Sequence, residues 1–133
     1  MAKQHNPASI PLLSLDALAF DSETTGLDTS SARMIQLGAV RIVHGEVEET
    51  QNFQQLIHPG VPIPPESQAI HGISDADVSE ASDFSEVARA FDEWRQDSVL
   101  VGYATGFDLA MLKRESEIAG LEWSAPRCLD VRF

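Results

Sequence analysis

The chain has 133 residues, of which 43% are hydrophobic and 23% are charged, and its formal net charge is −12. These values are typical of one globular domain and exclude a wholly disordered or collagen-like chain. A single cysteine excludes an internal disulfide, and no apolar stretch is long enough to span a bilayer.

The N-terminus lacks the layout of a signal peptide, so we expect a cytoplasmic protein with no membrane association. The excess of acidic residues argues against a broad basic stripe that tracks long nucleic acid. This acidity either serves solubility alone or includes carboxylates that bind metal cations. In the second case, the bound metals would supply the positive charge that holds a phosphodiester.

The first half of the chain predicts an arm and then three strands. We expect residues 1–14 to form a loosely held N-terminal arm and residues 15–133 to form one domain. Apolar runs and alternation predict strands at 17–20, at about 34–43 and to about 57. His44-Gly45 predicts the turn between the last two strands, and Gly26 is expected to allow positive φ in the turn after the first.

The second half predicts helices on either side of one short strand. Apolar spacing and capping signals predict the following elements in chain order: a short helix within 64–72, a helix start at 74–77, a helix over about 83–96, a strand at 99–101, a helix over about 107–119 with Gly120 at its end, and a strand beginning at 128–129. The pattern is typical of a mixed α/β domain whose hairpin makes part of the sheet antiparallel.

Two carboxylates, Asp21 and Glu23, directly follow the first predicted strand. Because they lie two residues apart, an extended backbone places both side chains on one face. Oxygen ligands of this kind suit magnesium or manganese. An Asp-x-Glu pair is also consistent with a solvated strand end or a helix cap.

Asp108 lies at the start of the last predicted helix, directly after the strand at 99–101 and a turn. Acidic residues are common at helix starts, where they cap the backbone and complement the helix dipole. If the strands before Asp21 and Asp108 are parallel neighbours, the three carboxylates meet at one rim of the sheet. Open α/β sheets bind their ligands at this rim.

Three segments in order resemble the DnaQ-like 3′–5′ exonucleases, also called the DEDD family. They are Phe20-Asp21-Ser22-Glu23-Thr24-Thr25-Gly26-Leu27-Asp28, Ile70-His71-Gly72-Ile73-Ser74 and Leu100-Val101-Gly102-Tyr103-Ala104-Thr105-Gly106-Phe107-Asp108. The resemblance covers about residues 15–133. It implies an RNase H-like fold, a mixed sheet with flanking helices that is incomplete at the C-terminus.

The resemblance also implies roles at matching positions. Asp21, Glu23 and Asp108 match three metal-binding carboxylates, which hold two divalent cations, Mg²⁺ or Mn²⁺, at the scissile phosphate. The substrate would be a single-stranded nucleic-acid 3′ end or a nucleotide. The residues that match substrate contacts are Thr24, Thr25, Gly26, Leu27, His71 and Phe107. Phe107 is equally consistent with core packing, and His71 with a local turn.

The chain departs from the family pattern in two places. The second motif commonly reads glycine–histidine–asparagine, whereas this chain has Gly102-Tyr103-Ala104. In the histidine branch, the third motif is a histidine followed by an aspartate five residues later, and no histidine follows Asp108 here. We interpret Asp130 as structural, and we expect the chain to be truncated before the last helices of the domain.

Two classes of function follow. The first is a metal-dependent 3′–5′ exonuclease that releases 5′-nucleoside monophosphates and that belongs to a larger protein with other domains or subunits. The second is a degenerate, non-catalytic module of the same fold that binds nucleotides or nucleic acid. Three retained carboxylates favour the first class, and Tyr103-Ala104 favours the second. The 133 residues alone are expected to be inactive or nearly so, because they lack a general base.

Overall fold

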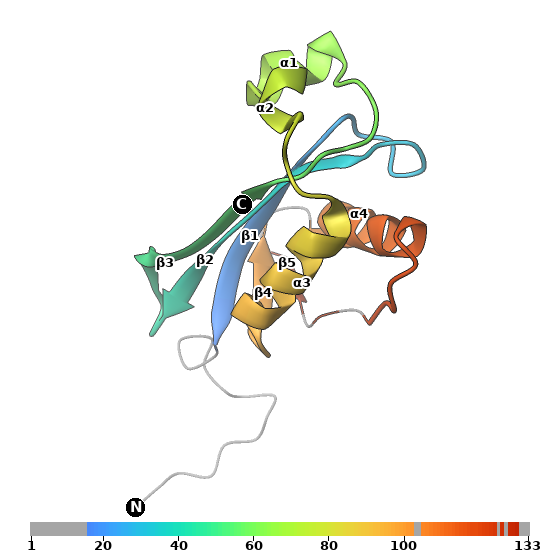
Figure 1. Ribbon diagram of the computed structural model, residues 1–133. Coiled ribbons are helices and arrows are strands. Elements are labelled where there is room, and N and C mark those ends of the chain that lie inside the picture. Colours follow the sequence, from blue (N-terminus) through green and yellow to red (C-terminus); the bar gives the residue numbers. More distant parts are fainter. Residues whose placement is uncertain (1–15, 103–104, 125, 127, 131–133) are drawn as a thin grey trace, which may run out of the picture.

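The computed structural model describes residues 16–102, 105–124, 126 and 128–130 (Figure 1). The predicted N-terminal arm and the last three residues lie outside the described residues. The elements in chain order are β1 (Ala17–Thr24), β2 (Met34–Val43), β3 (Glu46–Leu56), α1 (Pro65–His71), α2 (Asp75–Val78), α3 (Phe84–Arg95), β4 (Val99–Gly102), α4 (Thr105–Ile118) and β5 (Cys128–Asp130). Within the described part, no helix is long and apolar enough to cross a membrane.

The described strands form one mixed sheet in the order β3-β2-β1-β4-β5. Strand β1 is central, because it pairs antiparallel with β2 and parallel with β4. The β2–β3 hairpin is antiparallel and the β4–β5 pair is parallel. This arrangement confirms the predicted α/β class. It also meets the condition set by the sequence, because the strand that contains Asp21 and the strand that precedes Asp108 are parallel neighbours.

The first strand is longer than predicted. The sequence pattern ended it at Phe20, but β1 continues through Thr24, so Asp21 and Glu23 lie inside the strand rather than after it. Asp21 pairs with Gly38 and Glu23 pairs with Gln36, and a register shift follows Glu23. The prediction failed because these polar residues belong to a half-exposed stretch, where ladder pairing rather than burial maintains the strand.

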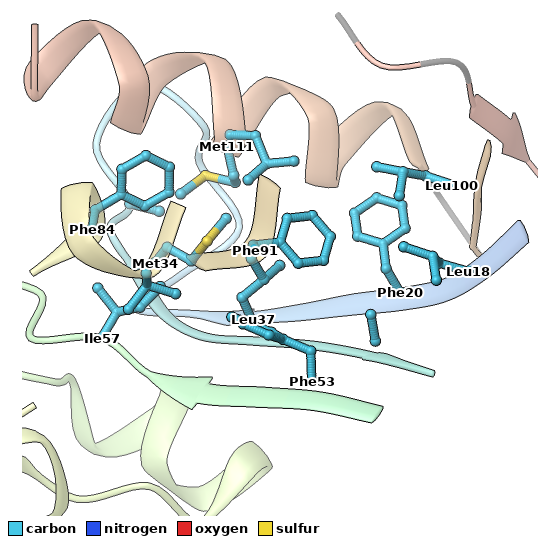
Figure 2. Close-up of a cluster of buried hydrophobic side chains, with 14 residues drawn as sticks. Leu18, Phe20, Met34, Leu37, Phe53, Ile57, Phe84, Phe91, Leu100 and Met111 are labelled. Carbon is cyan, nitrogen blue, oxygen red and sulfur yellow. The ribbon is translucent and has the colours of Figure 1, made fainter. Parts of the chain in front are cut away.

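Helices α3 and α4 cover one face of the sheet (Figure 1), and the main hydrophobic core lies between these helices and the sheet. Figure 2 shows the core side chains from the sheet and from both helices directed into this space. The fully or nearly buried members include Leu18, Leu37, Phe91, Leu100 and Met111. The apolar side chains whose spacing predicted the helix over about 83–96 pack here, on one face of α3.

The short helices α1 and α2 lie beyond one end of the sheet (Figure 1) and cover a smaller buried cluster of Ile35, Ile63 and Val78. Proline at the first helical position starts α1, and Gly72 ends it with φ of 75°. Ser74 begins α2 with a reciprocal capping box. Local sequence signals therefore fix the segment that carries His71.

The turn predicted at His44-Gly45 and the helix end predicted at Gly120 are both present, whereas Gly26 differs from its prediction. His44 and Gly45 both take positive φ, as a tight β-hairpin turn requires, and Gly120 ends α4 with φ of +71°. Gly26, in contrast, is not among the glycines with positive φ. The prediction for Gly26 was wrong because Thr25 and Arg33 bond to each other across the base of this loop, so the loop closes without a left-handed residue at 26.

Candidate active site

The site lies beside the second half of β1, where that strand loses its parallel neighbour. Strand β4 pairs with β1 at Ala17, Leu18 and Ala19 and then gives way to α4. The following residues of β1 therefore face an open edge that is flanked by Gly102 and the first turn of α4. A groove of about 870 Å³ borders this edge, and its lining includes Asp21, Glu23, Gly38 and Gly102.

Strand alternation places the β1 side chains on two sides of this edge. Asp21 is exposed and Glu23 is half-buried on the face away from α3 and α4. Ser22 points to the opposite face, like the core residues Leu18 and Phe20. The backbone N–H of Ser22 donates to Asp21 Oδ1 at 2.9 Å, which fixes the Asp21 carboxylate against the strand.

Asp108 approaches the same edge from the helix side. It lies in the first turn of α4 and is only 3% exposed. The Ser22 hydroxyl donates to Asp108 Oδ1 across 2.6 Å, so the strand holds the helix carboxylate directly. Asp108 is therefore a buried residue held against β1 beside this edge and is not a solvated helix cap.

The three carboxylates repel one another. Burial raises the pKa of Asp108 to about 6 against the opposing effect of the Ser22 hydrogen bond, and the charges of Asp21 and Glu23 raise it further. Burial also raises the pKa of Glu23, Asp21 adds to this effect, and His71 opposes it. The structure thus brings the predicted carboxylates into electrostatic contact around one edge.

The donor chemistry fits a divalent cation, although the side chains are not yet gathered around one point. Within the described part of the chain, no Lys, Arg or His forms an ion pair with Asp21, Glu23 or Asp108. Among the same residues, no three acidic, histidine or cysteine side chains lie close enough together to hold a metal ion. Asp21 and Glu23 reach the edge from one face and Asp108 from the other, which explains this separation.

The loop after β1 presents an exposed apolar side chain beside the site. Leu27 is 86% exposed. The Thr24 hydroxyl donates to the Gly26 carbonyl at 2.6 Å, and Thr25 is buried. An added Cβ at Gly26 would meet nothing within 4 Å, so the space over this glycine is open.

His71 ends α1 with one ring nitrogen fixed and the other free. Its Nδ1 accepts a hydrogen bond from the Ile73 backbone N–H at 3.0 Å, so Nε2 carries the proton of the neutral ring. Nε2 is buried and has no hydrogen-bond partner among the described residues. His71 therefore holds the local turn, and it lies close enough to Glu23 to oppose the rise in the pKa of that carboxyl.

The remaining predicted positions are less informative. Phe107 is half-buried and packs against the main core, which agrees with the core-packing alternative. Tyr103 and Ala104 lie outside the described residues, and so does the side chain of Asp130.

Sequence reasoning missed Ser22, Arg33 and Glu115, since each acts through a partner far along the chain. For Ser22, the only sequence signal was a hydroxyl between two carboxylates.

A comparison with protein families decides what kind of domain carries this site. The model of the exonuclease family (RNase_T) matches residues 18–130. The chain belongs to this exonuclease family. The match includes all three carboxylates and the loop after β1, and it confirms the DnaQ-like, RNase H-like prediction.

Relatives by sequence come from DNA polymerase III proteins. An epsilon-like protein of Rhodobacter capsulatus is 40% identical over 120 residues, which make up 90% of this chain and 17% of that protein. A PolC-type DNA polymerase III of Streptococcus suis is 32% identical over 117 residues, covering 88% of this chain and 8% of the relative. The chain thus spans less than a fifth of either relative.

Solved structures show the same fold at lower identity. Exonuclease I superposes with a TM-score of 0.74 at 17% identity, over 88% of this chain and 28% of that chain. Exonuclease X, in complex with 5′-overhanging duplex DNA, superposes with a TM-score of 0.65 at 20% identity, over 86% of this chain and 58% of that chain. The nuclease domain of 3′hExo, a DEDDh family member bound to rAMP, superposes with a TM-score of 0.71 at 16% identity, over 82% of this chain and 62% of that chain.

Proposed function

We propose that this exonuclease domain hydrolyses phosphodiester bonds from nucleic-acid 3′ ends and releases 5′-nucleoside monophosphates. The observation that carries the proposal is that Asp21, Glu23 and Asp108 lie along one open strand edge where, among the described residues, no Lys, Arg or His forms an ion pair with them. Burial of the Asp108 carboxylate beside two like charges is costly unless a ligand offsets it. This cost favours a catalytic site over a degenerate binding module.

Asp21, Glu23 and Asp108 would hold the divalent cations, Mg²⁺ or Mn²⁺. When bound, these cations supply neutralising charge and a lowered pKa for water. The loop residues Thr24 to Leu27 would hold the terminal nucleotide, with the exposed Leu27 side chain against the base. In the reaction, a water oxygen bonds to phosphorus, the 3′-oxygen bond breaks, and the released 3′-oxygen takes up a proton.

The test uses a chimera in which residues 18–130 replace the matching segment of the Rhodobacter capsulatus relative. We expect it to shorten a 5′-labelled single-stranded oligonucleotide from the 3′ end in Mn²⁺, with 5′-mononucleotides as products. Asp21→Asn, Glu23→Gln and Asp108→Asn should each abolish hydrolysis. Glu46→Gln is the matched control, because it removes an exposed carboxylate at the β2–β3 turn.

Several outcomes would contradict the proposal. Products with 3′-phosphates, or activity that persists in EDTA, would exclude metal-dependent 3′–5′ hydrolysis. Binding of the oligonucleotide without hydrolysis would support the non-catalytic module instead. We also propose that the 133 residues alone are inactive or nearly so, since no histidine follows Asp108 to act as the base. The same assay on the isolated chain tests this.

A further inference from the structure

A buried ion pair connects α4 to the start of β2, away from the carboxylates of the site. Arg33 Nε donates to Glu115 Oε1 at 2.5 Å, and Arg33 Nη2 donates to Glu115 Oε2 at 3.4 Å. Glu115 is only 1% exposed, whereas the Arg33 side chain is 24% exposed. The two-point contact fixes both the distance and the orientation of the two side chains.

Stability alone is a weak reason for this pair. A buried ion pair costs so much desolvation that apolar residues of similar volume are often equally stabilising. What a forked guanidinium–carboxylate contact adds is directional precision. A second arginine contacts the same segment by a single hydrogen bond, from Arg114 Nη1 to the Ala32 carbonyl at 2.9 Å. Helix α4 therefore contacts the end of the loop after β1 through two adjacent residues.

The backbone at Arg33 closes the loop that follows β1. The Thr25 N–H donates to the Arg33 carbonyl at 2.8 Å, and the Arg33 N–H donates to the Thr25 hydroxyl at 2.9 Å. The Thr25 carbonyl in turn accepts from the Ser67 hydroxyl at 2.6 Å, which attaches α1 to the same loop. Any movement of Arg33 is thus transmitted to Thr25 and to the helix that carries His71.

The helix side of the contact is equally direct. Glu115 follows Asp108 by two turns of α4, so both side chains lie on the same helix face, about 10 Å apart along the axis. Asp108 bonds to Ser22 of β1, and Glu115 bonds to Arg33 at the start of β2. Two carboxylates therefore fix α4 to β1 just before the loop that the substrate would contact and to the end of that loop at Arg33.

We propose that Arg33 and Glu115 are positioning residues that hold this loop in register with Asp108. The inference rests on the proposed function of the site. Loss of the pair lets the loop and α4 shift relative to each other, which moves the nucleotide contacts away from the third carboxylate. A displacement of about 1 Å at a reacting centre costs on the order of 100-fold in rate.

The decisive variant replaces both partners, Arg33→Met with Glu115→Leu, in the chimera described above. We expect its unfolding midpoint in urea to stay near that of the unmutated chimera, because no buried charge is left unpaired. We expect kcat on the labelled oligonucleotide to fall about 10- to 100-fold. Arg33→Lys should also lower kcat, since an ammonium cannot make the forked contact. Val87→Ala in the buried face of α3 is the control that destabilises without touching the loop.

A second measurement keeps the inference independent of catalysis. In the double variant, amide hydrogen exchange at Thr25 and Arg33 should accelerate by about tenfold or more, while Leu37 in β2 stays protected. Unchanged exchange at both amides, or a double variant with the kcat of the unmutated chimera, would overturn the positioning role. If the unmutated chimera lacks activity, the proposed function fails and hydrogen exchange alone decides the role of the pair.

Discussion

Replacing Asp108 with asparagine should stabilise the metal-free chain near neutral pH. The Asp108 carboxyl is buried beside Asp21 and Glu23 and accepts a hydrogen bond from Ser22 at 2.6 Å. An asparagine keeps the oxygen that accepts this bond and nearly the same shape, but it cannot ionise. The substitution therefore removes the buried charge and leaves the packing at the start of α4 intact.

The sign and size of the effect follow from the pKa. Burial raises the pKa of Asp108 from the ordinary 3.8 to about 6, so between these values the folded state binds more protons than the unfolded state. Stability is therefore highest below about pH 4 and is lost as the pH rises to about 6. At about 1.4 kcal/mol per pH unit, ionisation of Asp108 lowers the free energy of unfolding by at most about 3 kcal/mol. Solvent at the open edge screens part of this effect, so we expect a loss of about 1 to 2 kcal/mol.

Urea unfolding in EDTA, measured between pH 4 and 7.5, checks this expectation. The free energy of unfolding of the wild type should fall relative to Asp108→Asn between pH 4 and 6, and the two curves should run parallel above that. Asp16→Asn, at an exposed position just before β1, is the matched control and should follow the wild type. The reasoning about buried charge is wrong if the two curves are parallel throughout. It is also wrong if the free energy of unfolding of the wild type rises relative to that of the variant as the pH increases.

Three further substitutions test the core, a helix cap and the loop. Phe91→Ala should cost about 3 to 5 kcal/mol in urea unfolding, because Phe91 is 4% exposed and its ring stacks on Trp94 and packs at a tilt against Phe53. A loss below about 1 kcal/mol would contradict the packing. Asp83→Ala removes the side-chain cap of α3 and should cost about 1 kcal/mol, whereas Asp83→Asn should cost less. Leu27→Ala should change the free energy of unfolding by less than about 0.5 kcal/mol, because its side chain is exposed. In the chimera, the same substitution should raise KM for the oligonucleotide. An unchanged KM would show that Leu27 does not contact the substrate.

The elements that depend on local signals were predictable from the sequence. Alternation predicted β2 with the observed bounds, and the turn at His44-Gly45 lies where the sequence placed it. The capping signal at Ser74 is realised as a reciprocal pair of hydrogen bonds. Each of these features is encoded within a few neighbouring residues, so a single sequence is enough to reveal it.

The contacts that assemble the site were not predictable in the same way. Ser22–Asp108 and Arg33–Glu115 join residues whose spacing along the chain carries no periodic signal. The extension of β1 through Thr24 was missed for a related reason, since ladder pairing with β2 maintains a stretch that composition marks as a strand end. Family motifs identified Asp108 but gave no indication of the serine that holds it.

The parallel pairing of β1 with β4 determines when the site comes together during folding. The hydrogen bond from Ser22 to Asp108 spans 86 residues, and the bond from Arg33 to Glu115 spans 82. Hairpins close on the microsecond timescale, whereas contacts of such separation form late because of the loop-closure entropy that they cost. On the ribosome, β1, β2 and β3 emerge well before α4. The nascent hairpin therefore exposes its apolar helix-facing surface until α3 and α4 are synthesised, and that interval is when the chain is most open to aggregation or chaperone binding.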